Sequence, residues 1–166
     1  MLKVKASYGV QGNDRILNDY AYVDQFSLSN DNDNQSLVLG YKANKDLTWE
    51  SSHNFNVGVD FELFDRRLNG TIEYFNRQTK DMLYYKPTPS SMGYSSVPMN
   101  VGSVRNNGVE IDVNGIIIEG KDFSWSANAN ATFLKNKILK LHPDLNGEWI
   151  SGAYIYREGD PMYQFY

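Results

Sequence analysis

Acidic side chains are the most frequent candidates for chemistry in this 166-residue chain, but their placement does not indicate catalysis. They occupy the polar positions of alternating apolar–polar runs, so we expect them to face one polar interior. There they would be hydrated or would pair across strands with Lys3, Lys5 and Arg77. A glycosidase pair depends on a specific separation across the fold, which sequence spacing does not define. The residues concerned are Glu50, Asp60, Glu62, Glu73, Glu110 and Asp112.

Histidine and cysteine usage gives no sign of a metal site or a nucleophile. His53 and His142 are the only histidines, and neither has a partner at a metal-ligand spacing. We interpret His53 as an interfacial residue on the same face as Phe55. No G-x-S-x-G motif occurs, and the absence of cysteine excludes disulfides and thiolate ligands. The sequence therefore predicts no catalytic residue, no metal and no cofactor, and we interpret the protein as not an enzyme.

Two acidic stretches invite a calcium interpretation that their spacing does not support. Residues 31–34 read Asp-Asn-Asp-Asn, but an EF-hand loop starting at Asp31 needs a glycine at its sixth position and an acid at its twelfth. Those positions hold Ser36 and Lys42. We predict a solvated loop at residues 31–34 and a turn at residues 144–148.

Aromatic and amide side chains in two predicted loops are the better candidates for ligand contact. Sugars stack on aromatic faces and form hydrogen bonds with amides and carboxylates. The alternative is that these residues pack against their own loops or belong to an aromatic belt at a membrane surface. The candidates for ligand binding are Tyr84, Tyr85, Tyr94, Asn100, Trp149, Tyr154 and Tyr156.

Five alternating runs must position these residues. They cover residues 2–8, 49–63, 68–83, 109–118 and 123–133, and most of their apolar side chains fall on every second position. Phe75 breaks the pattern by placing an aromatic side chain on the polar face, and residues 116–118 are three consecutive isoleucines. Short turns are predicted at 64–67 and 119–122, and long loops at 10–48, 84–107 and 134–166. We find no extended helical period. The pattern predicts an all-β chain, an antiparallel up-and-down meander of about five long strands.

The apolar faces of these runs could meet either a protein core or lipid. The runs reach about 10 residues or more, which exceeds the usual 5–6 of globular strands and matches the 9–11 of membrane-spanning strands. Short turns at one end, long loops at the other and aromatic residues near both ends are typical of outer-membrane barrels. The alternative is a self-contained soluble β-barrel or sandwich that binds a ligand inside. A covered apolar face would favour that alternative.

Composition limits the classes of partner and the kinds of membrane segment that the chain can have. The formal net charge is −4, and no clustered basic face is present, so we expect no nucleic acid partner. No stretch of about 18 apolar residues indicates a transmembrane helix. Alternation begins at Leu2, where a signal peptide would show an apolar core, so we expect the chain to be a piece of a longer protein.

An ordered set of short motifs resembles one family. ASYG at residues 6–9 and QGN at 11–13 resemble a strand and loop of SusC/RagA-type TonB-dependent transporters. Six further segments resemble motifs of the same family: DLTWE (46–50), NVGVDF (56–61), RLNG (67–70), YFNR (74–77), TKDML (79–83) and NVGSVRNNGVE (100–110). Each motif alone is weakly specific, but their order and spacing cover residues 2 to about 136.

The resemblance implies a piece of a 22-stranded outer-membrane barrel whose lumen holds an N-terminal plug. It implies TonB-driven nutrient uptake of oligosaccharides or peptides beneath a SusD-like surface lipoprotein, in the outer membrane of Bacteroidota. Residues 1–166 carry no plug and no TonB-contacting region, so the chain is expected to be a barrel fragment that transports nothing alone. Isolated from the bilayer, it is expected to self-associate through its apolar face.

Overall fold

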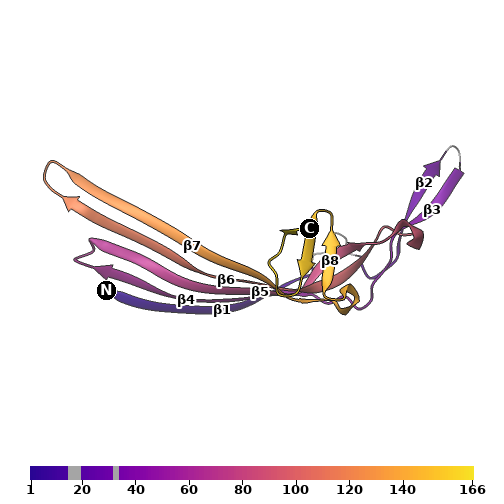
Figure 1. The fold of residues 1–166 in the computed structure, drawn as a ribbon, viewed down its shortest axis with the longest axis horizontal. Helices are drawn as coiled ribbons and strands as arrows, with labels where there is room; N and C mark the ends of the chain where they lie inside the picture. The colour runs from indigo at the N-terminus through magenta and orange to yellow at the C-terminus, as the bar shows by residue number, and fades with distance from the viewer. Residues whose placement is uncertain (15–19, 32–33) are drawn as a thin grey trace.

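The computed structural model describes residues 1–14, 20–31 and 34–166, and its main feature is a long, curved antiparallel sheet (Figure 1). Its strands lie in the spatial order β1-β4-β5-β6-β7, each antiparallel to the next. This confirms the all-β meander of about five long strands. In the described part of the chain, no helix has the length and apolar character needed to cross a membrane. The strands are β1 (Leu2–Asn13), β4 (Glu50–Leu63), β5 (Leu68–Pro87), β6 (Ser96–Glu119) and β7 (Ser124–Leu141).

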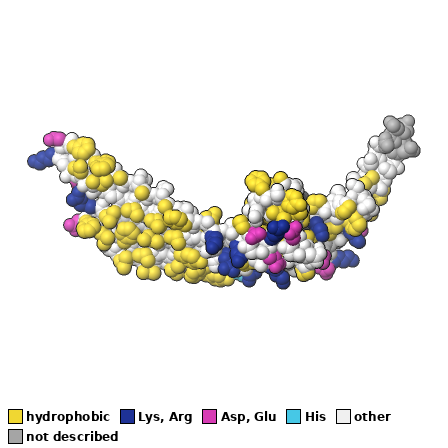
Figure 2. Space-filling model, in the orientation of Figure 1, with side chains coloured by type: hydrophobic (Ala, Val, Ile, Leu, Met, Phe, Trp, Pro, Cys, Tyr) yellow, Lys and Arg dark blue, Asp and Glu magenta, His cyan; other side chains and the backbone are white. Residues whose placement is uncertain are grey.

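The register places the apolar side chains of all five strands on one face. Val4 pairs with Val59, Val59 with Ile72, Ile72 with Ile111, and Ile111 with Ala131, so one apolar row crosses the sheet. These side chains remain accessible: Val4 is 69% and Ile72 46% exposed. Figure 2 shows hydrophobic side chains gathered over the long strands. No layer of described residues covers this face, as a soluble sandwich would require.

Tight turns join the long strands at one end. Residues 64–67 link β4 to β5, and Phe64, Asp65 and Arg66 all have positive φ. The Arg67 amide donates to the Phe64 carbonyl at 3.0 Å and closes this turn. Between β6 and β7, the Gly120 amide donates to the Phe123 carbonyl at 2.9 Å. Both hairpins therefore reverse within a few residues, and the sheet has a compact end.

The opposite end contains far more strand than the sequence indicates. The loop predicted at 84–107 is mostly wrong, because β5 continues to Pro87 and β6 starts at Ser96. Pro98 lies in the ladder opposite Tyr85, and its carbonyl accepts a hydrogen bond from Asn44 Nδ2 at 3.0 Å. Proline ends a strand only where its missing N–H is needed for pairing. A 3₁₀ turn, η1 (Ser90–Met92), lies in the short connection that remains.

The loop predicted at 10–48 is also partly structured. Its first residues extend β1 to Asn13, and β2 (Gln25–Asp31) and β3 (Asn34–Tyr41) form a hairpin that projects from the end of the molecule (Figure 1). A single parallel bridge between Tyr41 and Ser96 joins β3 to β6. In the acidic stretch at 31–34, Asn32 and Asp33 lie outside the described residues.

The segment predicted as a loop at 134–166 forms a second, small sheet. β7 continues to Leu141, and a 3₁₀ turn, η2 (Pro143–Leu145), follows. The small sheet has the order β10-β9-β8 and stands above the inside of the curve in Figure 1. The apolar–polar alternation does not reveal these strands, because each is too short to show a repeated pattern. They are β8 (Glu148–Ser151), β9 (Tyr154–Arg157) and β10 (Gln164–Phe165).

The main cluster of buried hydrophobic side chains lies where the small sheet meets the long one. Val101 is 1% and Ile138 2% exposed. Ile138 lies on the polar-face side of β7, because residues 126–138 alternate without interruption. Two backbone hydrogen bonds of 2.8 Å attach the segment after β9 to β7. The Ile138 amide donates to the Asp160 carbonyl, and the Gly159 amide donates to the Ile138 carbonyl. The cluster comprises Met99, Val101, Val104, Ile138, Leu141 and Leu145.

Candidate functional site

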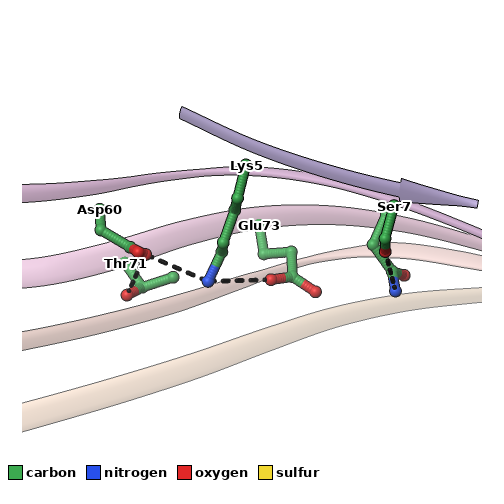
Figure 3. Close-up of polar contacts among 6 residues, drawn as sticks. Lys5, Ser7, Asp60, Thr71 and Glu73 are labelled. Atoms are coloured by element: carbon green, nitrogen blue, oxygen red, sulfur yellow. Dashed lines mark hydrogen bonds and ion pairs between the residues drawn. The ribbon is translucent and has the colours of Figure 1, made fainter. Parts of the chain in front are cut away.

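A lysine-centred ion-pair network occupies the polar face of β1, β4 and β5. Lys5 Nζ lies 3.1 Å from Asp60 Oδ1 and 3.2 Å from Glu73 Oε2, so one cation bridges carboxylates of two other strands (Figure 3). Thr71 Oγ1 donates to Asp60 Oδ1 at 2.9 Å. Further along this face, Asn56 Nδ2 donates to Ser7 Oγ at 3.4 Å. The expected cross-strand pairing of these carboxylates is therefore present for Asp60 and Glu73.

The network depends on a missing side chain at Gly58. A Cβ atom at this position would lie 2.9 Å from Lys5 Cε and 3.3 Å from Glu73 Cβ. Because glycine leaves this space open, the lysine side chain can cross β4 to reach β5. Ion pairs on the polar face thus join β1, β4 and β5.

Phe75 interrupts the polar face, and the structure shows why an aromatic residue fits there. Its side chain is buried, at 5% exposure, and packs over Gly108 on the neighbouring strand, where a Cβ would lie 2.9 Å from the ring Cζ. The guanidinium carbon of Arg77 lies 5.2 Å from the ring centroid, which allows a cation–π contact. The ring therefore fills the space above a glycine and links β5 to β6.

The two histidines and the acidic side chains are the groups that could hold a metal ion. Among residues 1–14, 20–31 and 34–166, no three His, Cys, Asp or Glu side chains form a group that could hold a metal ion. His53 lies near the start of β4, and its Nδ1 is 3.0 Å from the Tyr8 hydroxyl on β1. His142 Nδ1 accepts the Asp144 amide at 3.3 Å and begins η2. Both histidines thus have local structural partners.

Three of the predicted ligand residues come together in an aromatic cluster at the loop end. Trp149 stacks on Tyr156 with ring centroids 5.0 Å apart, and Tyr84 meets Trp149 edge-on at 4.7 Å. Tyr163 extends the cluster, with its ring centroid 6.1 Å from Tyr156 and 5.6 Å from Tyr154. Burial raises the pKa of the Tyr156 hydroxyl above its usual value, because the ionised form would lose solvation. The cluster joins β5 to β8 and β9.

An ion pair between Glu148 and Arg157 joins two of the three strands of the small sheet, β8 and β9. Arg157 Nε donates to Glu148 Oε2 at 2.7 Å, and both side chains are about half exposed. The carboxylate raises the pKa of the guanidinium above its usual value. Such an exposed pair contributes modestly to stability. It lies next to the cross-strand pair of Trp149 on β8 and Tyr156 on β9.

A cavity of about 300 Å³ opens beside the aromatic cluster. Tyr84, Trp149 and Tyr156 form one wall. The buried core supplies part of the rest, including Val101, Ile138 and Leu141. The cavity therefore lies on the polar-face side of the sheet, the side to which Ile138 of β7 points.

Tyr94 and Asn100 lie at a second hollow, of about 350 Å³, that is lined mainly by polar side chains. The Asn100 amide is already engaged: its Nδ2 donates to the carbonyls of Thr48 at 2.9 Å and Asp81 at 2.7 Å, and its Oδ1 accepts the Thr48 amide at 3.0 Å. Asn100 therefore ties the segment before β4 to the irregular part of β5, where Asp81 has φ 53°. This arrangement gives Asn100 a structural role at the hollow.

The two remaining candidates, Tyr85 and Tyr154, do not line either hollow. Tyr85 packs against Tyr41 of β3 with ring centroids 5.5 Å apart, and burial raises the pKa of its hydroxyl. Tyr154 packs against Tyr163 and Phe165. Neither ring lines the apolar cavity or the polar hollow.

Sequence reasoning missed several residues of the cavity wall. Met82 and Met162 line it, as do Tyr163 and Lys140. Met82 lies in β5, where the ladder register shifts between Thr79 and Met82, so alternation misassigns its face. The sequence around Met162 has no periodicity, and only its aromatic content, Tyr163 and Phe165, signals a packed segment.

A long antiparallel sheet with one exposed apolar face, one charged face, tight turns at one end and elaborate connections at the other defines a segment of an outer-membrane β-barrel wall. The sequence profile described as "TonB dependent receptor-like, beta-barrel" matches residues 1–161. The chain belongs to this family, and its likeness to SusC and RagAB proteins places it among the SusC/RagA-type transporters.

Relatives and solved structures agree with this assignment. The chain is 34% identical over 170 residues to a TonB-dependent receptor of Formosa agariphila, a match covering 100% of this chain and 16% of that receptor. It is 31% identical over 148 residues to TonB-dependent receptor SusC of Bacteroides thetaiotaomicron, covering 84% of this chain and 15% of SusC. Its fold matches the structure of the RagAB peptide transporter with a TM-score of 0.85 and 32% identity, over 97% of this chain and 18% of the matched chain. The chain thus spans less than a fifth of these proteins.

Proposed function

We propose that residues 1–166 are part of the barrel wall of a TonB-dependent importer in the bacterial outer membrane. The importer takes up oligosaccharides or peptides and makes or breaks no bond in them. The observation that carries this proposal is the pair of opposite faces: an uncovered apolar row through Val4, Ile72 and Ile111, and a charged face centred on Lys5. A lipid bilayer outside and an aqueous lumen inside satisfy both.

Orientation follows from the two ends of the sheet. In outer-membrane barrels the short turns are periplasmic and the long connections extracellular. The turn at 64–67 then lies in the periplasm, and the aromatic cluster and hairpin β2–β3 lie at the cell surface. A SusD-like lipoprotein is the partner at that surface, and the TonB complex acts through a region outside residues 1–166. The resemblance to SusC and RagAB proteins supports both partners.

The aromatic cluster is the proposed ligand contact. Tyr84, Trp149 and Tyr156 present rings to a cavity on the lumen side of the sheet, where a passing ligand would meet them before entering the barrel. Tyr94 and Asn100 line the second hollow, and Asn100 would act there through positioning. Tyr85 and Tyr154 would support the loops that carry these residues.

Uptake by cells that produce the full-length protein tests the proposal. Depletion of peptides and oligosaccharides from the medium is measured with and without a protonophore that collapses the energy source of TonB. We expect energised uptake of one class, reduced by Trp149→Ala and retained in Trp125→Ala, because Trp125 lies on β7 next to the short turn. Surface amounts are equalised by immunoblot. Uptake that continues unchanged with the protonophore would contradict the proposal.

The isolated chain offers a second test. Its uncovered apolar face is expected to drive association in water. Light scattering should show oligomers of residues 1–166 that dissociate when detergent is added, and a monomer in water would contradict an exposed face of this size.

A further inference from the structure

The cavity beside the aromatic cluster is apolar over most of its wall. Two methionines, Met82 and Met162, and the aliphatic side chains of Val101, Ile138 and Leu141 surround it, and Trp149 closes one side. Among the described residues that line it, Lys140 alone carries a charged side chain. Its volume of about 300 Å³ lies at the lower end of the range for small-molecule pockets.

This lining suits a different ligand from the polar hollow. A sugar ring needs hydrogen-bond partners for its hydroxyls around the stacking face, since unpaired polar groups are costly when buried. The polar hollow provides such groups through Asn44, Asp46, Lys86 and His142. The apolar cavity has the hydroxyl groups of Ser103 and three tyrosines among its lining residues, but most of its wall consists of thioethers, aliphatic groups and ring faces, which complement a hydrocarbon or aromatic side chain.

The two methionines make the cavity adaptable. Methionine is flexible and polarisable, so a wall containing Met82 and Met162 can adjust to side chains of different shape. The backbone around the cavity is held in place: the Met162 amide donates to Asn136 Oδ1 at 2.6 Å, and the Leu141 amide donates to Glu158 Oε1 at 2.8 Å. A stable frame with flexible lining favours a class of ligands over one compound.

We infer that this cavity is a subsite for an apolar side chain of a peptide, and that the substrate class of the importer is therefore peptides. The inference rests on the proposed function, because it assumes that ligands reach the loop end of the lumen. It goes further by choosing between the two substrate classes that the importer proposal leaves open. Lys140 at the cavity then suits a peptide carboxylate.

Variants that fill the cavity provide the test. Met162→Phe enlarges a side chain that lines it, and Met82→Phe does the same from β5, in case the first variant fails to assemble. Met92→Phe is the matched control, since Met92 lines the polar hollow and is 54% exposed. Assembly of each full-length variant is checked by its heat-dependent mobility on gels.

The readout is the set of peptides that purified full-length protein retains from a synthetic octapeptide pool with randomised positions, identified by mass spectrometry. We expect Leu, Met and Phe to be enriched about tenfold over Ser at one peptide position, since burying such a side chain is worth at least that factor. Met162→Phe or Met82→Phe should abolish this enrichment, and Met92→Phe should keep it.

Other outcomes overturn the inference in distinguishable ways. Enrichment that survives both cavity-filling variants shows that the cavity takes no peptide side chain. Retention of maltohexaose or xylohexaose, lost in Met162→Phe, with no retention of peptides, shows that the cavity belongs to a glycan site while the importer proposal stands. If the protein retains neither class and cells show no energised uptake, the proposed function fails together with the inference.

Discussion

Val57 and Val101 both lie within strands of the same long sheet, but they have opposite surroundings. Val57 is 36% exposed on the apolar face of β4, whereas Val101 is 1% exposed beneath the small sheet. The part of the sheet toward the short turns is a single layer held by backbone ladders, and its apolar side chains are left uncovered. In the barrel wall that we propose, these side chains face lipid. The loop end has a second layer and buries its own hydrophobic side chains. Apolar side chains of the same chain therefore have two environments: an exposed face on the long strands and a protein core at the loop end.

The largest expected effect on stability is a difference between substitutions on the apolar face and on the polar face of the long strands. Ala129 lies on the apolar face of β7 opposite Val113, and its neighbour Asn130 lies on the polar face opposite Asp112. Ala129→Arg should destabilise the full-length barrel by about 2–4 kcal/mol, the cost of arginine near the bilayer centre. Asn130→Arg should have little effect. Urea unfolding in lipid vesicles measures both, and equal effects would contradict the assigned faces.

A second prediction concerns the close contacts between strands. At Gly108 a Cβ would overlap the backbone carbonyl oxygen of Phe133 and meet the Phe75 ring. Gly108→Ala should cost about 1–3 kcal/mol, because the backbone carbonyl cannot move aside without straining the ladder. Gly115→Ala on the same strand is the control, since its nearest contact would be at 3.8 Å. The same unfolding assay applies, and a neutral Gly108→Ala would exclude tight β5–β6–β7 packing there.

The loop end should respond to loss of a single buried methyl group. Ile138→Val should cost about 0.5–1.5 kcal/mol, as for other buried isoleucines, and should loosen the small sheet. Ile116→Val removes the same atoms from a side chain that is 39% exposed and should be nearly neutral. Limited proteolysis of residues 142–166 in the full-length protein reports on local opening. Equal cleavage rates for the two variants would contradict a packed loop end.

The smallest effect is expected from the polar face. Lys5→Met removes the cation between Asp60 and Glu73 and leaves two carboxylates close together. All three side chains are partly exposed, so the loss of stability should be small and should shrink as salt is added. Lys121→Met, in the exposed turn between β6 and β7, is the control. The unfolding midpoints are compared at low and high salt, and a loss that does not depend on salt would show that Lys5 acts through packing.

The two regions also differ in how far the sequence predicts them. Alternation from Phe55 to Leu63 and from Leu68 to Tyr74 reflects a sheet whose two faces meet different media, so pattern alone identifies the strands. The turn residues 64–67 follow from the break in that pattern. Here each residue's environment is set by its immediate neighbours along the chain and across one ladder.

The loop end depends on contacts between distant residues. Asn100 reaches Thr48 and Asp81, and Tyr84 meets Trp149, across gaps in sequence that no local pattern records. Proline and serine in residues 87–98 also suggest a loop, although Pro87, Ser96 and Pro98 pair in β5 and β6. The aromatic composition points to the correct region for Tyr84, Trp149 and Tyr156. It does not show that Met82 and Met162 complete the cavity.

Residue-by-residue labelling of β7 tests most directly whether the apolar face meets lipid. Residues 1–166 contain no cysteine, so single cysteines can be placed at positions 126–131 of the full-length protein in outer membranes, with any cysteine elsewhere replaced. We predict that a lipid-dissolved maleimide labels positions 127, 129 and 131. A water-soluble maleimide should label positions 126, 128 and 130. Water-soluble labelling of the odd positions, or equal labelling of all six, would contradict the account.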